Sequence, residues 1–188
     1  MQTRHLEIPG PIEIVPAKHG DDRGFFSETF NSASLGQHGI HETWVQDNHA
    51  VSYEAGVLRG LHYQLPPHAQ AKLIRVSRGA IFDVVVDIRT GSPTFGRWVG
   101  VELSVAAWNQ LYVPVGFAHG YLTLSSNTEV LYKVSSSYAP QSEGSIRFDD
   151  PDIQIDWPGD CEGFVLSNKD RNAGALSDSA NVFEWREQ

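Results

Sequence analysis

The chain has 188 residues, of which 40% are hydrophobic and 20% charged, and its net charge is −9. We expect one globular domain over residues 1–188. The negative charge argues against nucleic acid or an anionic membrane as a partner, because both bind extended basic surfaces. No apolar run approaches the length of a membrane span, the first residues lack the apolar core of a signal peptide, and the single cysteine, Cys161, excludes an internal disulfide. These features predict a cytoplasmic protein.

Short segments with strand character follow one another along most of the chain, separated by turns rich in glycine and proline. Helical periodicity is almost absent, and one short helix is predicted over residues 31–38, capped by Asn31 or Ser32. Many short strands at this spacing predict an all-β sandwich or barrel. In chain order the predicted strands cover residues 12–15, 25–30, 43–53, 57–65, 71–77, 80–88, 97–104, 110–115, 118–124 and 128–136.

The segment AIFDVVVDI, residues 80–88, has alternating faces. Phe82 and Val84 fall on one face, whereas Asp83, Val85 and Asp87 fall on the other. Two aspartates on one face indicate either a solvent-exposed face or a face that lines a polar cavity inside a closed β fold. The sequence leaves both interpretations open.

From about residue 137 to residue 188 the composition changes to prolines, glycines and acidic residues. Apolar side chains still recur there, among them Ile146, Ile153 and Trp157, and they require burial. We therefore expect an ordered, loop-rich segment that wraps around the β structure.

Two segments match paired motifs at a fixed order in the chain. VPVGFAHG, residues 113–120, contains the spacing P-x-G-x-x-H in full, and Gly56, His62 and Gly79 match the opening and the close of G-x5-H-x-H…E-x6-G. Together they resemble the two motifs of the cupin superfamily, a β jelly roll. The resemblance implies a cupin-type double-stranded β-helix with a cavity inside it.

Two positions of the first motif carry unexpected residues. Gln64 stands at the second histidine position and Lys72 at the glutamate position. Divalent metals prefer imidazole and carboxylate ligands, and an ammonium group has no lone pair to offer. We therefore expect a cavity without a metal, in which His62, Lys72 and His119 converge on an organic substrate.

The types of these residues suit proton abstraction next to a carbonyl group. Imidazole is the usual side-chain base at neutral pH, so His62 is suited to take the proton. Lys72 is suited to stabilising an enolate oxygen, and Tyr132 to returning a proton on the opposite face. Other schemes that use the same groups remain open.

A longer series of segments makes the expectation more specific. DDRGFF, VQDNHA, LRGLHYQ, QAKLIRV, GFAHG and SNKD occur in this order between about residues 10 and 170. Together they resemble the dTDP-4-dehydrorhamnose 3,5-epimerase family. The resemblance implies a jelly-roll enzyme with no metal and no cofactor. Such an enzyme inverts C3 and C5 of dTDP-4-keto-6-deoxy-D-glucose and gives dTDP-4-keto-L-rhamnose.

The resemblance also implies catalytic roles. His62 matches the family's base and Tyr132 its acid. Asp170 matches the carboxylate partner of the base, and Lys72 matches the residue near the ketone oxygen. Asp83 lies in a matching segment, and we expect it near Lys72 or His62.

Substrate-binding roles follow from the same resemblance. Arg23 and Arg59 match contacts to the diphosphate, and Tyr138 matches the ring that stacks on thymine. The resemblance implies a homodimer whose exchanged N-terminal strands bring Arg23 and Glu28 into the partner's site. Tyr63 and Ala71 depart from the family pattern of Phe after the base and Gly before the lysine. Further residues match substrate contacts in the family: Glu28, Gln46, Asn48, Lys72, His119, Glu143 and Lys169.

Three alternatives use the same scaffold. The first is an epimerase that inverts only C3 or only C5 of a related dTDP-4-keto-deoxysugar. The second is a non-catalytic cupin that binds a sugar nucleotide. The third is a metal-dependent cupin oxygenase.

Overall fold

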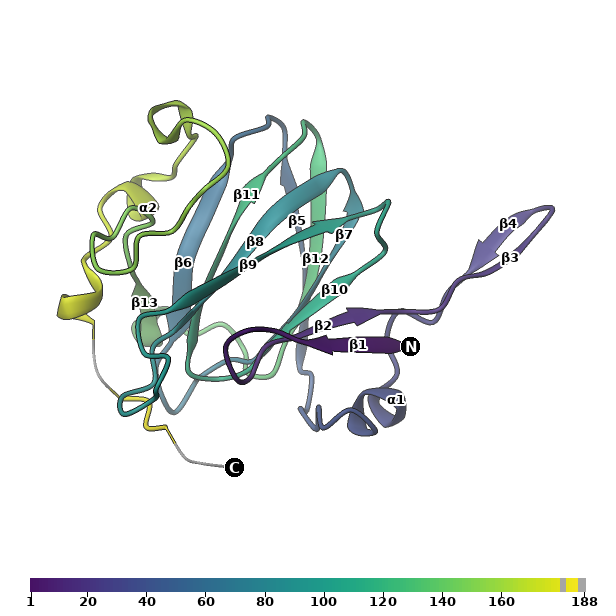
Figure 1. The fold of residues 1–188 in the computed structure, drawn as a ribbon, viewed down its shortest axis with the longest axis horizontal. Coiled ribbons are helices and arrows are strands. Elements are labelled where there is room, and N and C mark those ends of the chain that lie inside the picture. The colour runs from purple at the N-terminus through teal and green to yellow at the C-terminus, as the bar shows by residue number, and fades with distance from the viewer. Residues whose placement is uncertain (180–181, 186–188) are drawn as a thin grey trace.

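The computed structural model describes residues 1–179 and 182–185. Two antiparallel sheets form the centre of the structure, and Figure 1 shows them wrapped into one β structure. From β6 onward the chain crosses repeatedly between the sheets, which is the path of a double-stranded β-helix. The all-β cupin-type fold is therefore confirmed. The six-stranded sheet has the order β1 (Gln2–His5), β2 (Ile12–Val15), β10 (Gln110–Val113), β7 (Lys72–Arg78), β12 (Thr128–Val134) and β5 (Gln46–Ser52). The five-stranded sheet has the order β13 (Glu143–Ser145), β6 (Leu58–Gln64), β11 (Phe117–Thr123), β8 (Ala80–Asp87) and β9 (Trp98–Ser104).

Strand β8 is buried on both faces, which explains its nearly continuous apolar sequence. Val85 packs in the core between the two sheets, and Val84 packs on the opposite face beneath the C-terminal segment. Asp83 and Asp87 are fully buried, so the solvent-exposed interpretation of this face is wrong. Asp87 pairs with Arg89 at 2.7 Å between Oδ2 and Nη2, whereas Asp83 faces the interior.

The C-terminal segment covers the outer face of the five-stranded sheet. Ile146, Ile153 and Trp157 pack there in one buried cluster with Phe183. The indole of Trp157 donates a hydrogen bond to the carbonyl oxygen of Phe148 at 2.9 Å. Besides β13, the described part of this segment contains four short helices: η1 (Pro140–Ser142), η2 (Cys161–Gly163), α2 (Asn168–Arg171) and η3 (Leu176–Asp178).

The N-terminal region includes a hairpin that projects away from the sheets, formed by β3 (His19–Asp21) and β4 (Gly24–Phe26) (Figure 1). The predicted strand over residues 25–30 is wrong beyond Phe26. Ser27 instead accepts a hydrogen bond from the indole of Trp108 at 2.9 Å, and this contact keeps the segment from pairing with another strand. Helix α1 (Ser32–Gly36) is confirmed, with Asn31 as its N-cap.

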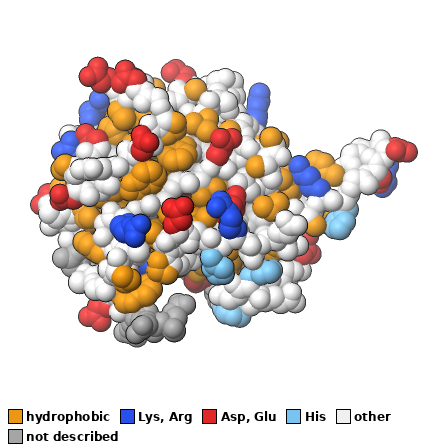
Figure 2. Space-filling model, viewed as in Figure 1, with side chains coloured by type: hydrophobic (Ala, Val, Ile, Leu, Met, Phe, Trp, Pro, Cys, Tyr) orange, Lys and Arg blue, Asp and Glu red, His pale blue; other side chains and the backbone are white. Residues whose placement is uncertain are grey.

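The surface mixes charged side chains of both signs. On the face in Figure 2, Lys and Arg are interspersed with Asp and Glu, and no extended basic patch is visible. Phe25 and Phe26 on the projecting hairpin are 53% and 70% exposed. In the described part of the chain, no helix has both the length and the apolar character needed to cross a membrane.

Candidate active site

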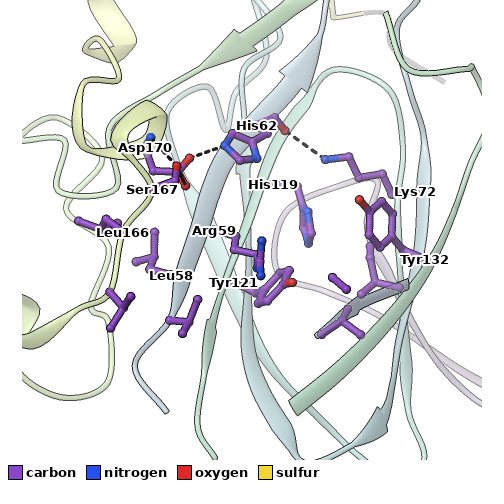
Figure 3. A pocket seen from close by; sticks show the side chains of 15 residues that line it. Leu58, Arg59, His62, Lys72, His119, Tyr121, Tyr132, Leu166, Ser167 and Asp170 are labelled. Atoms are coloured by element: carbon purple, nitrogen blue, oxygen red, sulfur yellow. Dashed lines mark hydrogen bonds and ion pairs between the residues drawn. The ribbon is translucent and has the colours of Figure 1, made fainter. Parts of the chain in front are cut away.

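A cavity of about 490 Å³ lies between the two sheets. Figure 3 shows that His62, His119 and Arg59 reach it from β6 and β11, whereas Lys72 and Tyr132 face them from β7 and β12. The loop and helix around residues 165–170 close one side. Six of the residues predicted for the site therefore line one space: Arg59, His62, Lys72, His119, Tyr132 and Asp170.

His62 and Asp170 form a close pair at the edge of the cavity. Nε2 of His62 lies 2.5 Å from Oδ1 of Asp170 (Figure 3). Ser167, the N-cap of α2, donates its hydroxyl to Oδ2 of Asp170 at 2.7 Å, so the short helix fixes the carboxylate. Burial raises the pKa of Asp170, but the hydrogen bonds from His62 and Ser167 lower it by more. The pKa of Asp170 therefore lies below its usual value.

The charge of Asp170 fixes the tautomer of the imidazole. An ionised carboxylate only accepts hydrogen bonds, so Nε2 of His62 carries the proton. Nδ1 then keeps its lone pair. The carboxylate also stabilises the imidazolium that forms when Nδ1 takes up a proton. The pair is thus suited to act as a general base.

Lys72 begins β7, in the sheet opposite His62. Its Nζ donates a hydrogen bond to the main-chain carbonyl oxygen of His62 at 3.3 Å, so the two side chains share the cavity. Burial lowers the pKa of the Lys72 ammonium to about 8, although the nearby charge of Asp83 opposes the shift. A cation with few water neighbours interacts strongly with a negative charge that develops beside it.

Tyr132 lies across the cavity from His62 (Figure 3). It projects from β12 opposite Asn48 of β5 and Ile74 of β7. Burial raises the pKa of its phenol, and the charge of Arg59 lowers it in part. The phenol therefore keeps its proton at neutral pH and can donate it.

His119 is the register partner of His62 on the neighbouring strand β11. Its Nε2 lies 2.8 Å from Oδ1 of Asp83, so the hydrogen bond of Asp83 goes to His119 rather than to His62. Burial lowers the pKa of His119, and Asp83 opposes this shift. Two histidines on adjacent strands, His62 and His119, thus line the cavity, and each is paired with a carboxylate.

Arg59 is held at the mouth of the cavity by the edge of β5. Its guanidinium donates to the carbonyl oxygen of Val51 at 3.2 Å and to the hydroxyl of Ser52 at 3.3–3.4 Å. The next residue, Gly60, has φ +125°, and a Cβ there would lie 2.5 Å from the Cα of Gly120. This close approach of β6 and β11 requires glycine, and it sets the position of Arg59 relative to His62.

A second group of predicted residues lies at the rim. Tyr138 is 56% exposed, and its hydroxyl donates a hydrogen bond to Oε2 of Glu143 at 3.2 Å. Lys169 forms an ion pair with the same carboxylate. Gln46 accepts a hydrogen bond from the Tyr138 amide at 3.1 Å and donates to Asn48 at 2.7 Å. These five residues adjoin one another, and Lys169 precedes Asp170 in α2, but none lines the cavity itself.

Arg23 and Glu28 lie apart from all the other predicted residues. Arg23 is in the projecting hairpin, where it pairs with Asp21 at 2.5 Å between Nη2 and Oδ2. Glu28 follows the hairpin and is exposed. Neither residue reaches the cavity of its own chain.

The residues at the altered cupin positions are engaged in other contacts. The amide of Gln64 donates to the carbonyl oxygens of His68, at 2.6 Å, and Ser137, at 3.2 Å. Within residues 1–179 and 182–185, no three histidine, cysteine or acidic side chains are grouped closely enough to hold a metal ion.

The sequence interpretation missed two residues of the site. Ser167 orients Asp170, and the S-x-x-D spacing of a helix cap was the available signal. Tyr121 lines the cavity, and strand alternation from His119 places it on the same face.

The fold and the acid–base groups in its cavity define a cupin-type isomerase. A family model described as dTDP-4-dehydrorhamnose 3,5-epimerase matches residues 5–178, and this chain belongs to that family. A dTDP-4-dehydrorhamnose 3,5-epimerase from Pseudomonas aeruginosa is 47% identical over 180 residues, which are 95% of this chain and 98% of that protein. Family membership sets aside the non-catalytic and oxygenase alternatives.

Two solved structures are also similar. A dTDP-6-deoxy-D-glucose-3,5-epimerase from Legionella pneumophila, in complex with dTDP-4-keto-L-rhamnose, has a TM-score of 0.93 and 43% identity, with 99% of each chain covered. A 3′-monoepimerase from Streptomyces bikiniensis, in complex with dTDP-quinovose, has a TM-score of 0.84 and 41% identity, covering 92% of this chain and 86% of that chain.

Proposed function

We propose that His62 and Tyr132 carry out the epimerisation by proton transfer on opposite faces of the sugar. The substrate is dTDP-4-keto-6-deoxy-D-glucose and the product dTDP-4-keto-L-rhamnose. The observation that carries this proposal is that His62 with Asp170 lies on one wall of the cavity and Tyr132 with Lys72 on the other (Figure 3). Inversion requires such an arrangement, because the proton leaves one face of the carbon and returns to the other.

Each inversion proceeds in two steps. Nδ1 of His62 takes the proton from C3 or C5, and the electron pair of the C–H bond moves through the C4 carbonyl to its oxygen. Lys72 stabilises the enolate oxygen. The electron pair then returns to the carbon, which takes a proton from the hydroxyl of Tyr132. Solvent takes the proton from His62 and reprotonates Tyr132.

The nucleotide part of the substrate is assigned to the mouth and the rim of the cavity. Arg59 binds the diphosphate, because a guanidinium offers paired donors to phosphate oxygens. Tyr138 presents an exposed ring on which thymine stacks. Further substrate contacts come from Lys72 and His119 inside the cavity and from the rim residues Gln46, Asn48, Glu143 and Lys169.

Position-resolved proton exchange in heavy water tests the proposal. Incubation of the protein with dTDP-4-keto-6-deoxy-D-glucose should place deuterium at both C3 and C5, as NMR reads directly. The alternative of inversion at C3 alone has support in the similarity to the 3′-monoepimerase. It predicts deuterium at C3 alone. Deuterium at C5 alone would indicate a C5-epimerase, and no exchange at either carbon would overturn the proposed function.

The pH dependence of turnover should report the charge of Lys72. Since its pKa is lowered to about 8, the ammonium is present below this pH and is lost as the pH rises through it. We therefore expect kcat to fall above about pH 8. The Lys72→Arg variant stays charged throughout this range and should lose the alkaline decline, whatever its own kcat. If kcat of the Lys72→Arg variant still fell above pH 8 as in the wild type, the decline would come from the titration of another group.

We also propose that the protein acts as a homodimer in which the projecting hairpin completes the partner's site with Arg23 and Glu28. Two observations support this. The hairpin leaves Phe25 and Phe26 largely exposed, although aromatic side chains favour burial. Arg23 is 90% exposed and lies outside the cavity of its own chain.

Mixing two inactive variants tests the exchange of the hairpin. Arg23→Ala and His62→Asn are assayed separately at low substrate concentration and then after subunit exchange. A mixed dimer contains one intact site only if Arg23 serves the partner, so about a quarter of wild-type activity should return from an equimolar mixture. Arg23→Ala mixed with the Arg23→Ala/His62→Asn double variant is the control. Recovery no greater than in this control would exclude exchange of the hairpin.

A further inference from the structure

The hydroxyl of Tyr121 is a buried polar group without a hydrogen-bond partner among the described residues. The side chain is 5% exposed and lines the cavity (Figure 3). Its ring packs in the core between the sheets, so the hydroxyl cannot turn outward to bulk solvent. An unsatisfied buried hydroxyl is costly to the folded protein.

The surroundings of Tyr121 indicate where its partner must come from. On the cavity side its apolar neighbours include Ile74 and Val130, which offer no side-chain acceptor. The polar groups nearest to it are Arg59, Tyr132 and Asp83, and none of them forms a hydrogen bond with the hydroxyl. The mechanism described above gives Tyr121 no role. Its partner is therefore a group that enters the cavity with the substrate.

The register of β11 places Tyr121 between two parts of the site. In the strand register, Tyr121 lies opposite Arg59 of β6, which is assigned to the diphosphate. His119, two residues earlier, lies opposite His62. The rings of His119 and Tyr121 lie 6.4 Å apart between centroids. Along the sugar, C1 carries the diphosphate and C3 loses a proton to His62. The group between them is the hydroxyl on C2.

We propose that the Tyr121 hydroxyl donates a hydrogen bond to the C2 hydroxyl of the sugar and thereby selects 2-hydroxy over 2-deoxy substrates. This inference rests on the proposed function. A site that hydrogen-bonds a substrate hydroxyl discriminates against the analogue without it, because its own polar group is then left unpaired. Tyr121 is thus a specificity-determining residue and takes no part in the proton transfers.

Tyr121→Phe tests the proposal with two substrates, dTDP-4-keto-6-deoxy-D-glucose and its 2-deoxy analogue. The variant removes only the hydroxyl, so kcat/KM should fall about tenfold for the 2-hydroxy substrate and stay unchanged for the analogue. Tyr63→Phe, whose ring packs on the other face of the five-stranded sheet, is the control and should preserve the wild-type ratio. The Tm of the free Tyr121→Phe protein should equal or exceed that of the wild type, because an unpaired hydroxyl is gone.

The possible outcomes separate this inference from the proposed function. Equal losses on both substrates, or no loss on either, would overturn the role of Tyr121 and leave the epimerase assignment standing. A wild-type protein that exchanges neither proton of the 2-hydroxy substrate would overturn both.

Discussion

Replacing His62 by asparagine is expected to lower kcat by on the order of 10³-fold. The asparagine amide can still contact Asp170, but it has no basic nitrogen to take the proton from C3 or C5. Both exchange reactions should slow together, since one base serves both carbons. Deuterium uptake at each carbon, measured under single-turnover conditions, separates the chemical step from product release.

A matched control distinguishes loss of the base from loss of the fold. His49→Asn makes the same change in the six-stranded sheet, where His49 lies on the outer face of β5 and pairs with Glu129. This control should retain wild-type turnover, and both variants should bind dTDP with similar Kd. If His62→Asn kept most of its turnover, another group would be the base, and the mechanism above would be wrong.

The approximate positions of most strands and the polar positions of the cavity could be predicted because they depend on local patterns. Alternation in residues 80–88 indicated the two faces of β8, and the resemblance of the glycine and histidine spacing to the cupin motifs implied the cupin fold. The residues at positions 64 and 72, Gln64 and Lys72, indicated an unusual cavity from the sequence alone. These signals depend on neighbours within a few residues, which is why sequence reasoning reached them.

Contacts between distant segments could not be derived in the same way. His62 and Asp170 are 108 residues apart, and only the wrapping of the C-terminal segment brings them together. Strand β13, with the sequence EGS, has no strand propensity, and its pairing with β6 depends on where the chain returns. The link between these residues came from the family resemblance.

The projecting hairpin and Tyr121 illustrate two other limits. The strand predicted over residues 25–30 failed because Ser27 is held by Trp108, a tertiary contact that overrides local propensity. Alternation could place Tyr121 on the face of His119, but only coordinates reveal that its hydroxyl lacks a partner. Unsatisfied groups are a property of the packed protein, so the sequence does not display them.

Replacing Lys72 by methionine should lower kcat by about 10²- to 10³-fold and change the Kd for dTDP by less than about threefold. Methionine keeps the apolar stem of the side chain but removes the cation. The charge on the ketone oxygen develops only in the transition state, so the loss should fall on kcat. Turnover and calorimetric titration with dTDP measure the two quantities. Losses of equal size in both would assign Lys72 to ground-state binding of the nucleotide.

The same substitution should stabilise the folded protein at pH 7. Burial lowers the pKa of Lys72 from 10.5 to about 8, so the folded state holds this proton more weakly than the unfolded state does. The wild type therefore carries a cost below pH 8, up to about 3 kcal/mol, which disappears as the pH rises from 8 toward 10.5. Lys72→Met should be more stable at pH 7, and its advantage should shrink over that range. A variant that is more stable yet nearly inactive would show that the charge of Lys72 serves catalysis and destabilises the folded protein.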